Sequence, residues 1–137
     1  MSTSVLMDLD ARLDSEDARA VLSAVWDVFT VATEVADAVT FEEGSDELQA
    51  MSAAQQCMGG RDLLPVPQDG MPVEVPALGR GAADLGPYVR LLEHAQQALA
   101  RLVLSADRIG EGAERSLSEA TRMASNAAVA LAAVRER

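Results

Sequence analysis

The chain has 137 residues, which suits one domain of ordinary size. Its 22 Asp and Glu residues oppose 11 Arg and no Lys, giving a net charge of −11 at pH 7. This charge argues against direct binding to nucleic acid or an anionic membrane, because phosphate contacts need clustered cations. Hydrophobic residues make up 49%, enough for a core, so the chain is not a disordered acidic tail.

The compartment follows from charge and cysteine usage. Residues 1–10 carry two acids and no basic residue, the reverse of the basic start of a signal peptide. The longest uncharged apolar run, 123–134, is shorter than the roughly 20 residues of a membrane span. A single cysteine, Cys57, cannot form an intramolecular disulfide and is expected in the core. These features predict a soluble cytoplasmic protein, and the alanine-rich, lysine-free composition is typical of a GC-rich bacterial genome.

The strongest helical pattern predicts a helix over 15–43, capped by Asp14 or Ser15. Apolar residues recur there at spacings of three and four on one face: Ala18, Val21, Val25, Val28, Ala32, Val35 and Val39. Polar residues fall on the opposite face: Ser23, Asp27, Thr30, Glu34 and Asp37. The broad apolar face is typical of the central helix of a bundle, and residues 1–14 form a leading segment or short helix.

A second helix is expected over 46–58, capped by Ser45 and ended by Gly59-Gly60. Its apolar residues are Leu48, Met51, Ala54 and Met58. Residues 59–87 hold all five prolines and six of the nine glycines, which predicts an extended crossover. Asp69-Gly70 would allow a small hairpin within it.

Residues 87–136 keep the helical spacing but contain Gly110 and Gly112. We favour two helices, 87–110 and 116–136, because Ser116 to Glu119 forms a capping-box pattern. The alternative is one continuous helix, which would make the protein a dimeric hairpin of two very long helices. The predicted fold is a single all-α domain, 1–137, an antiparallel bundle of about four helices whose broad apolar faces are compatible with a homodimer.

Candidate chemical groups are few. With one histidine, His94, and one cysteine, the chain offers no zinc, di-iron or thiol-protease pattern, so we expect no metal, no cofactor and no catalysis. An enzyme would require a cleft that gathers His94 with two or more carboxylates. The evenly spaced Arg101, Arg108, Arg115 and Arg122 are expected to be partly neutralised by nearby acids such as Glu119.

Acidity is concentrated in the first half of the chain: 12 acids and two arginines in 1–58 give −10, against ten acids and nine arginines, −1, in 59–137. This asymmetry favours a non-catalytic regulatory protein that binds another protein with a basic surface. The candidate contact residues are Trp26, Asp27, Glu34 and Asp37. The alternative is a small-molecule pocket between 15–43 and 87–110, closed by 59–87. Its candidate lining residues are Trp26, Met51, Tyr88 and His94.

Overall fold

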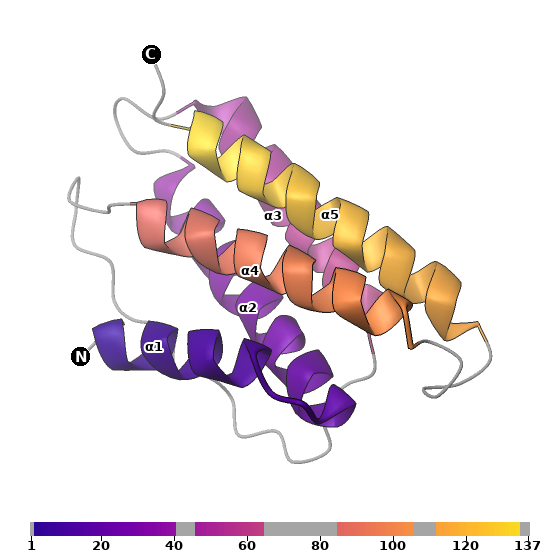
Figure 1. Ribbon diagram of the computed structural model, residues 1–137. Coiled ribbons are helices and arrows are strands. Elements are labelled where there is room, and N and C mark those ends of the chain that lie inside the picture. The colour runs from indigo at the N-terminus through magenta and orange to yellow at the C-terminus, as the bar shows by residue number, and fades with distance from the viewer. Residues whose placement is uncertain (1, 41–45, 65–84, 106–111, 135–137) are drawn as a thin grey trace.

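A computed structural model describes residues 2–40, 46–64, 85–105 and 112–134. These ranges contain helices and no strand, so the prediction of an all-α bundle is confirmed (Figure 1). The leading segment forms a helix of its own, which makes five helices in these ranges. They are α1 Ser2–Leu13, α2 Ala18–Val39, α3 Glu47–Asp62, α4 Gly86–Val103 and α5 Ala113–Ala133.

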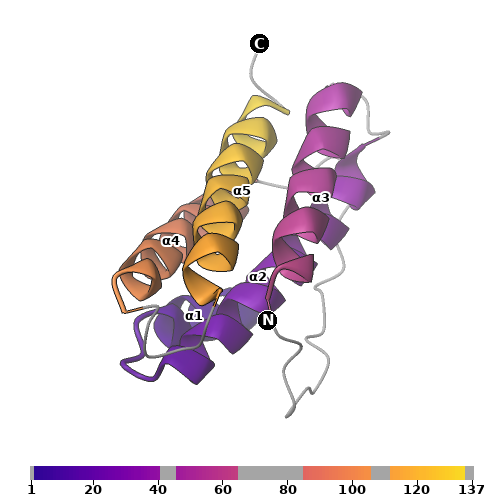
Figure 2. The same cartoon turned by 90° about the vertical axis from the view of Figure 1, so that its right-hand side faces the viewer.

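Helix α2 is the centre of the bundle and packs against α1, α3 and α4, while α5 lies between α3 and α4 (Figures 1 and 2). Six of the seven predicted apolar positions of α2 are buried, and Ala18 is half-buried. Phe29 is the largest of the fully buried side chains that the structure describes. One continuous core therefore joins all five helices.

The caps of α2 and α3 differ from those predicted. Asp17, rather than Asp14 or Ser15, caps α2, and its carboxylate accepts a hydrogen bond from the backbone N–H of Arg19 at 3.1 Å. Asp46, rather than Ser45, caps α3 by accepting from the N–H of Gln49 at 3.2 Å. A carboxylate at this position satisfies an otherwise unpaired N–H and suits the positive end of the helix dipole. Helix α2 ends at Val39, and the rest of the predicted helix, 41–43, lies outside the described residues.

Of the four apolar residues predicted to pack in α3, only Ala54 is buried, whereas Leu48, Met51 and Met58 are exposed. The buried positions of α3 are all small: Ala50, Ala53, Ala54, Cys57 and Gly60. The prediction that Gly59-Gly60 ends this helix is wrong, since α3 continues to Asp62. A Cβ built on Gly60 would lie 2.7 Å from the Phe29 ring, so the missing side chain allows this close approach.

The C-terminal region forms two antiparallel helices, in agreement with the favoured prediction (Figure 1). Helix α4 ends at Val103, earlier than expected, and α5 begins at Ala113 after Gly112, whose φ is +82°. Ser116 therefore lies within α5, and the predicted helix start at 116 is wrong. Helix α3 runs to Asp62 and α4 begins at Gly86, so both helices reach into the range predicted as a crossover, and residues 65–84 of that range lie outside the described residues. The suggested hairpin and Arg108 lie outside the residues that the structure describes.

Candidate functional site

The single histidine joins α4 to α1. The Nδ1 atom of His94 lies 2.6 Å from Asp10 Oδ1, and its Nε2 atom lies 2.8 Å from Asp14 Oδ1. Both aspartates lie at the C-terminal end of α1 and are mostly exposed, while the imidazole is largely covered. We call these three residues the His94 clamp.

The geometry of the His94 clamp suits a charged imidazole. Only imidazolium donates a hydrogen bond from both ring nitrogens, whereas a neutral ring would point one lone pair at a carboxylate. Burial lowers the pKa of His94, but the hydrogen bonds and charges of Asp10 and Asp14 outweigh it, and the net shift is upward. A histidine that transfers protons needs one nitrogen free for substrate. In the His94 clamp both ring nitrogens are engaged by carboxylates, and the three residues join α1 to α4.

The His94 clamp predicts that stability depends on pH. Because the pKa of His94 is raised by folding, its stabilisation is complete below the unfolded value of about 6.5 and is lost as pH rises through the folded value. At about pH 6 we expect His94→Gln to lower the free energy of unfolding by about 1 kcal/mol. The effect is modest because solvent screens the exposed aspartates. Urea denaturation of both proteins between about pH 5.5 and about pH 9 checks this. A difference that stays constant over this range would contradict it.

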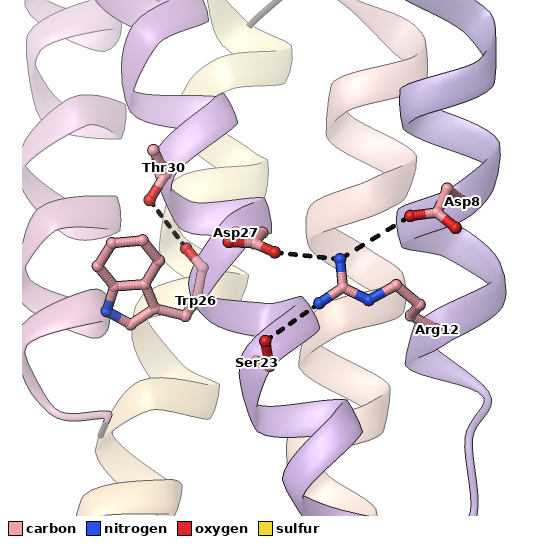
Figure 3. A network of polar contacts seen from close by, with 6 residues as sticks. All are labelled: Asp8, Arg12, Ser23, Trp26, Asp27 and Thr30. Carbon is pink, nitrogen blue, oxygen red and sulfur yellow. Dashed lines mark hydrogen bonds and ion pairs between the residues drawn. The ribbon is translucent and has the colours of Figure 1, made fainter. Parts of the chain in front are cut away.

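Asp27 lies in a second contact between α1 and α2. Its carboxylate accepts a hydrogen bond from Arg12 Nη1 at 3.0 Å, and Arg12 Nη2 donates to Ser23 Oγ at 3.1 Å (Figure 3). Asp8 lies 3.9 Å from the same guanidinium. Burial raises the pKa of Asp27, and Arg12 opposes this shift. The expectation of a solvent-facing Asp27 is therefore wrong, because α1 covers this part of α2.

Trp26 points the other way, toward α3 (Figure 3). The Arg61 guanidinium lies over its indole ring at 5.2 Å from the centroid, within the range of a cation–π contact. Arg61 Nη1 also donates to Thr30 Oγ1 at 3.2 Å. Trp26 is half-buried, so it lies at the edge of the surface shared by α2 and α3.

Glu34 and Asp37 continue the exposed edge of α2 beyond Trp26 and Thr30. Spacings of three and four place these four residues on one face of the helix. Helices α2 and α3 run antiparallel, so Glu34 and Asp37 lie beside the part of α3 that precedes Arg61 (Figures 1 and 2). Glu47 at the start of α3 is also exposed. We call Glu34, Asp37 and Glu47 the acidic margin; none of them is in an ion pair with another described residue.

Large apolar side chains lie exposed next to the acidic margin. Leu48 is 78% exposed, Met51 44% and Met58 40%, and we call these three residues the α3 apolar strip. The helical spacing of these residues and Ala54 predicted one buried apolar face, and the exposure of Leu48, Met51 and Met58 contradicts that prediction. The contrary signal was available in the small residues at helical spacing, Ala50, Ala53, Ala54, Cys57 and Gly60, which form the buried face.

The four residues proposed to line a pocket lie in different places. His94 contacts α1, Trp26 contacts α3, Met51 is exposed on α3, and Tyr88 is buried at the start of α4. Burial raises the pKa of Tyr88. Cys57 is fully buried, and burial raises the pKa of its thiol to about 12, so it is not a ready nucleophile.

Of the evenly spaced arginines that the structure describes, Arg101 and Arg122 make polar contacts, and Arg115 is exposed. Arg101 donates to the backbone oxygen of Leu13 at 2.8 Å and so caps the C-terminal end of α1. Arg122 pairs with Glu119 at 2.6 Å, as their spacing predicted. Among the described residues, no ion pair joins an arginine of the second half to an acid of the first half. The acidic margin is therefore not neutralised by the arginines that the structure describes.

Comparisons with protein-family models, curated proteins and solved structures found no significant match to this chain. Of the helices that the structure describes, none has the length and apolar character needed to cross a membrane. The described residues of the chain also contain no group of three or more His, Cys, Asp or Glu side chains arranged to hold a metal ion.

Proposed function

We propose that this chain is a non-catalytic regulatory protein of the bacterial cytoplasm that binds another protein with a basic surface. The observation that carries the proposal is the acidic margin, an exposed set of carboxylates without a cation of its own in the described part of the chain. Such carboxylates attract a basic partner and guide its approach.

Trp26 supports the same location. It lies at the edge of the α2–α3 surface on the helix face that also carries Glu34 and Asp37, and tryptophan is frequent among residues that dominate binding energy. Asp27 takes no part in this proposal, because Arg12 holds its carboxylate beneath α1. The proposed surface that binds the partner therefore consists of Trp26, Glu34 and Asp37 on α2 together with Glu47 on α3.

Affinity capture from the native cell at low salt tests the proposal. We expect Glu34→Gln combined with Asp37→Asn to recover about fivefold less of the partner, because two attractive charges are lost. The control replaces Glu93 and Glu114, exposed acids of α4 and α5, by Gln. It has the same net charge and should recover the partner as the wild type does. Capture of nothing at low salt, or an equal loss in both variants, would contradict the proposal.

A further inference from the structure

We propose that the α3 apolar strip is the docking surface for one amphipathic helix of the partner, a helix with an apolar face bordered by Lys or Arg. This inference rests on the proposed function and specifies the kind of partner segment. It is carried by the position of the strip beside the acidic margin.

Helix α3 buries alanine, cysteine and glycine and leaves its largest apolar side chains, Leu48, Met51 and Met58, in solvent. Single exposed apolar residues are common on protein surfaces, but three on one face of one helix form a patch of the kind that binds a partner. Methionine is frequent on such surfaces because its flexible side chain adapts to different partners.

The surface around the α3 apolar strip is bounded by contacts of α3 with α5 and with α2. On one side of the strip, α3 contacts α5 through Gln56 and Asn126 at 3.4 Å. On the other side, it contacts α2 through Arg61 and Thr30. The strip lies between these contacts, on the outward face of α3. From Leu48 to Asp62 this face is about 21 Å long, which matches a partner helix of about 14 residues.

Exposed acids lie at both ends of the outward face of α3, Glu47 at its start and Asp62 at its end. The antiparallel register set by the Arg61–Thr30 contact places Glu34 and Asp37 along the neighbouring edge of α2. The nearby cation, Arg61, is already engaged with Trp26 and Thr30. A second copy of the chain on this surface would bring acids against acids, which is unfavourable. A helix with Lys or Arg beside its apolar face would pack its apolar side chains on the strip and place its cations against the acidic margin.

The probe is a synthetic helix of leucine and lysine, about 14 residues long, with its leucines on one face. Its affinity is measured by fluorescence anisotropy at low salt. We expect Leu48→Gln, Met51→Gln and Met58→Gln together to weaken binding at least about tenfold, because apolar anchors dominate such interfaces. The matched control, Met7→Gln with Leu104→Gln, removes exposed apolar residues elsewhere and should change binding less than about twofold. All substitutions are uncharged and suit a helix, and circular dichroism checks the fold.

The possible outcomes separate this inference from the proposed function. A loss of about tenfold that is confined to the strip variant supports the inference. Equal binding by the wild type and the strip variant overturns it, and so does an absence of peptide binding; acid-dependent capture from cells would still support the proposed function. If ultracentrifugation shows that the wild type is a dimer and the strip variant a monomer, the occupant is a second copy, which also overturns the inference.

Discussion

Replacing Arg12 with Met is expected to lower the free energy of unfolding by about 2–3 kcal/mol. The substitution leaves the Asp27 carboxylate buried beneath α1 without its cation, and removing one partner of a buried ion pair costs more than the pair itself contributes. The expected loss is smaller than the roughly 3–5 kcal/mol of a fully buried pair, because the Arg12 side chain is about one-third exposed. Urea denaturation near neutral pH measures the loss.

Asp27→Asn provides the matched control. An amide at this position still accepts a hydrogen bond from Arg12, and Arg12 keeps Asp8 and Ser23 as neighbours. We therefore expect a loss of no more than about 1 kcal/mol. In the double variant, the Asp27→Asn substitution removes the unpaired charge, so part of the stability lost in Arg12→Met should return. Equal losses in the two single variants would contradict this explanation.

Gly60→Ala is expected to destabilise the protein by up to about 2 kcal/mol, although alanine favours helix more than glycine by about 1 kcal/mol. The new Cβ would lie 2.7 Å from the fully buried Phe29 ring, and overpacking of this kind costs about 1–3 kcal/mol. Because protein cores are close-packed, we expect the Cβ to be accommodated by a small separation of α2 and α3.

Gly59→Ala is the control on the same helix. Its Cβ would lie 3.0 Å from the sulfur of Met123, the flexible end of a side chain that can turn aside. Helix propensity then decides the sign of the change in the free energy of unfolding, and we expect stabilisation of up to about 1 kcal/mol. Thermal or urea unfolding of both variants distinguishes them, and a Gly60→Ala variant as stable as Gly59→Ala would contradict the packing described for α2 and α3.

The sequence predicted the helices better than it predicted their faces. The spacing of the apolar residues from Val21 to Val39 predicted α2 correctly, because a long apolar repeat with the period of a helix fits few other structures. The ends of the helices were predicted less accurately, because glycine serves two different purposes in this chain. Gly112 starts α5 through its positive φ, whereas Gly60 lies inside α3 to make room for Phe29. Composition alone does not distinguish a glycine needed for a turn from one needed for close packing.

The candidate site was predicted only in part for a related reason. Hydrophobicity suggested that Leu48, Met51 and Met58 face the core, but α3 lies too close to Phe29 for large side chains, so its small residues face inward. Asp27 was expected in solvent because a single helix pattern carries no information about α1 packing over it. His94 and its two aspartates are about 80 residues apart in sequence, and only the fold brings them together.

Methyl NMR of the methionines tests most directly whether the surface of α2 and α3 binds a basic partner. The chain has six methionines, of which Met51 and Met58 belong to the α3 apolar strip, and Met7 is exposed on α1 as an internal control. On titration with the leucine–lysine helix, we expect the methyl signals of Met51 and Met58 to shift and that of Met7 to remain in place. Shifts at Met7 without shifts at Met51 and Met58 would contradict the assignment of the binding surface to α2 and α3.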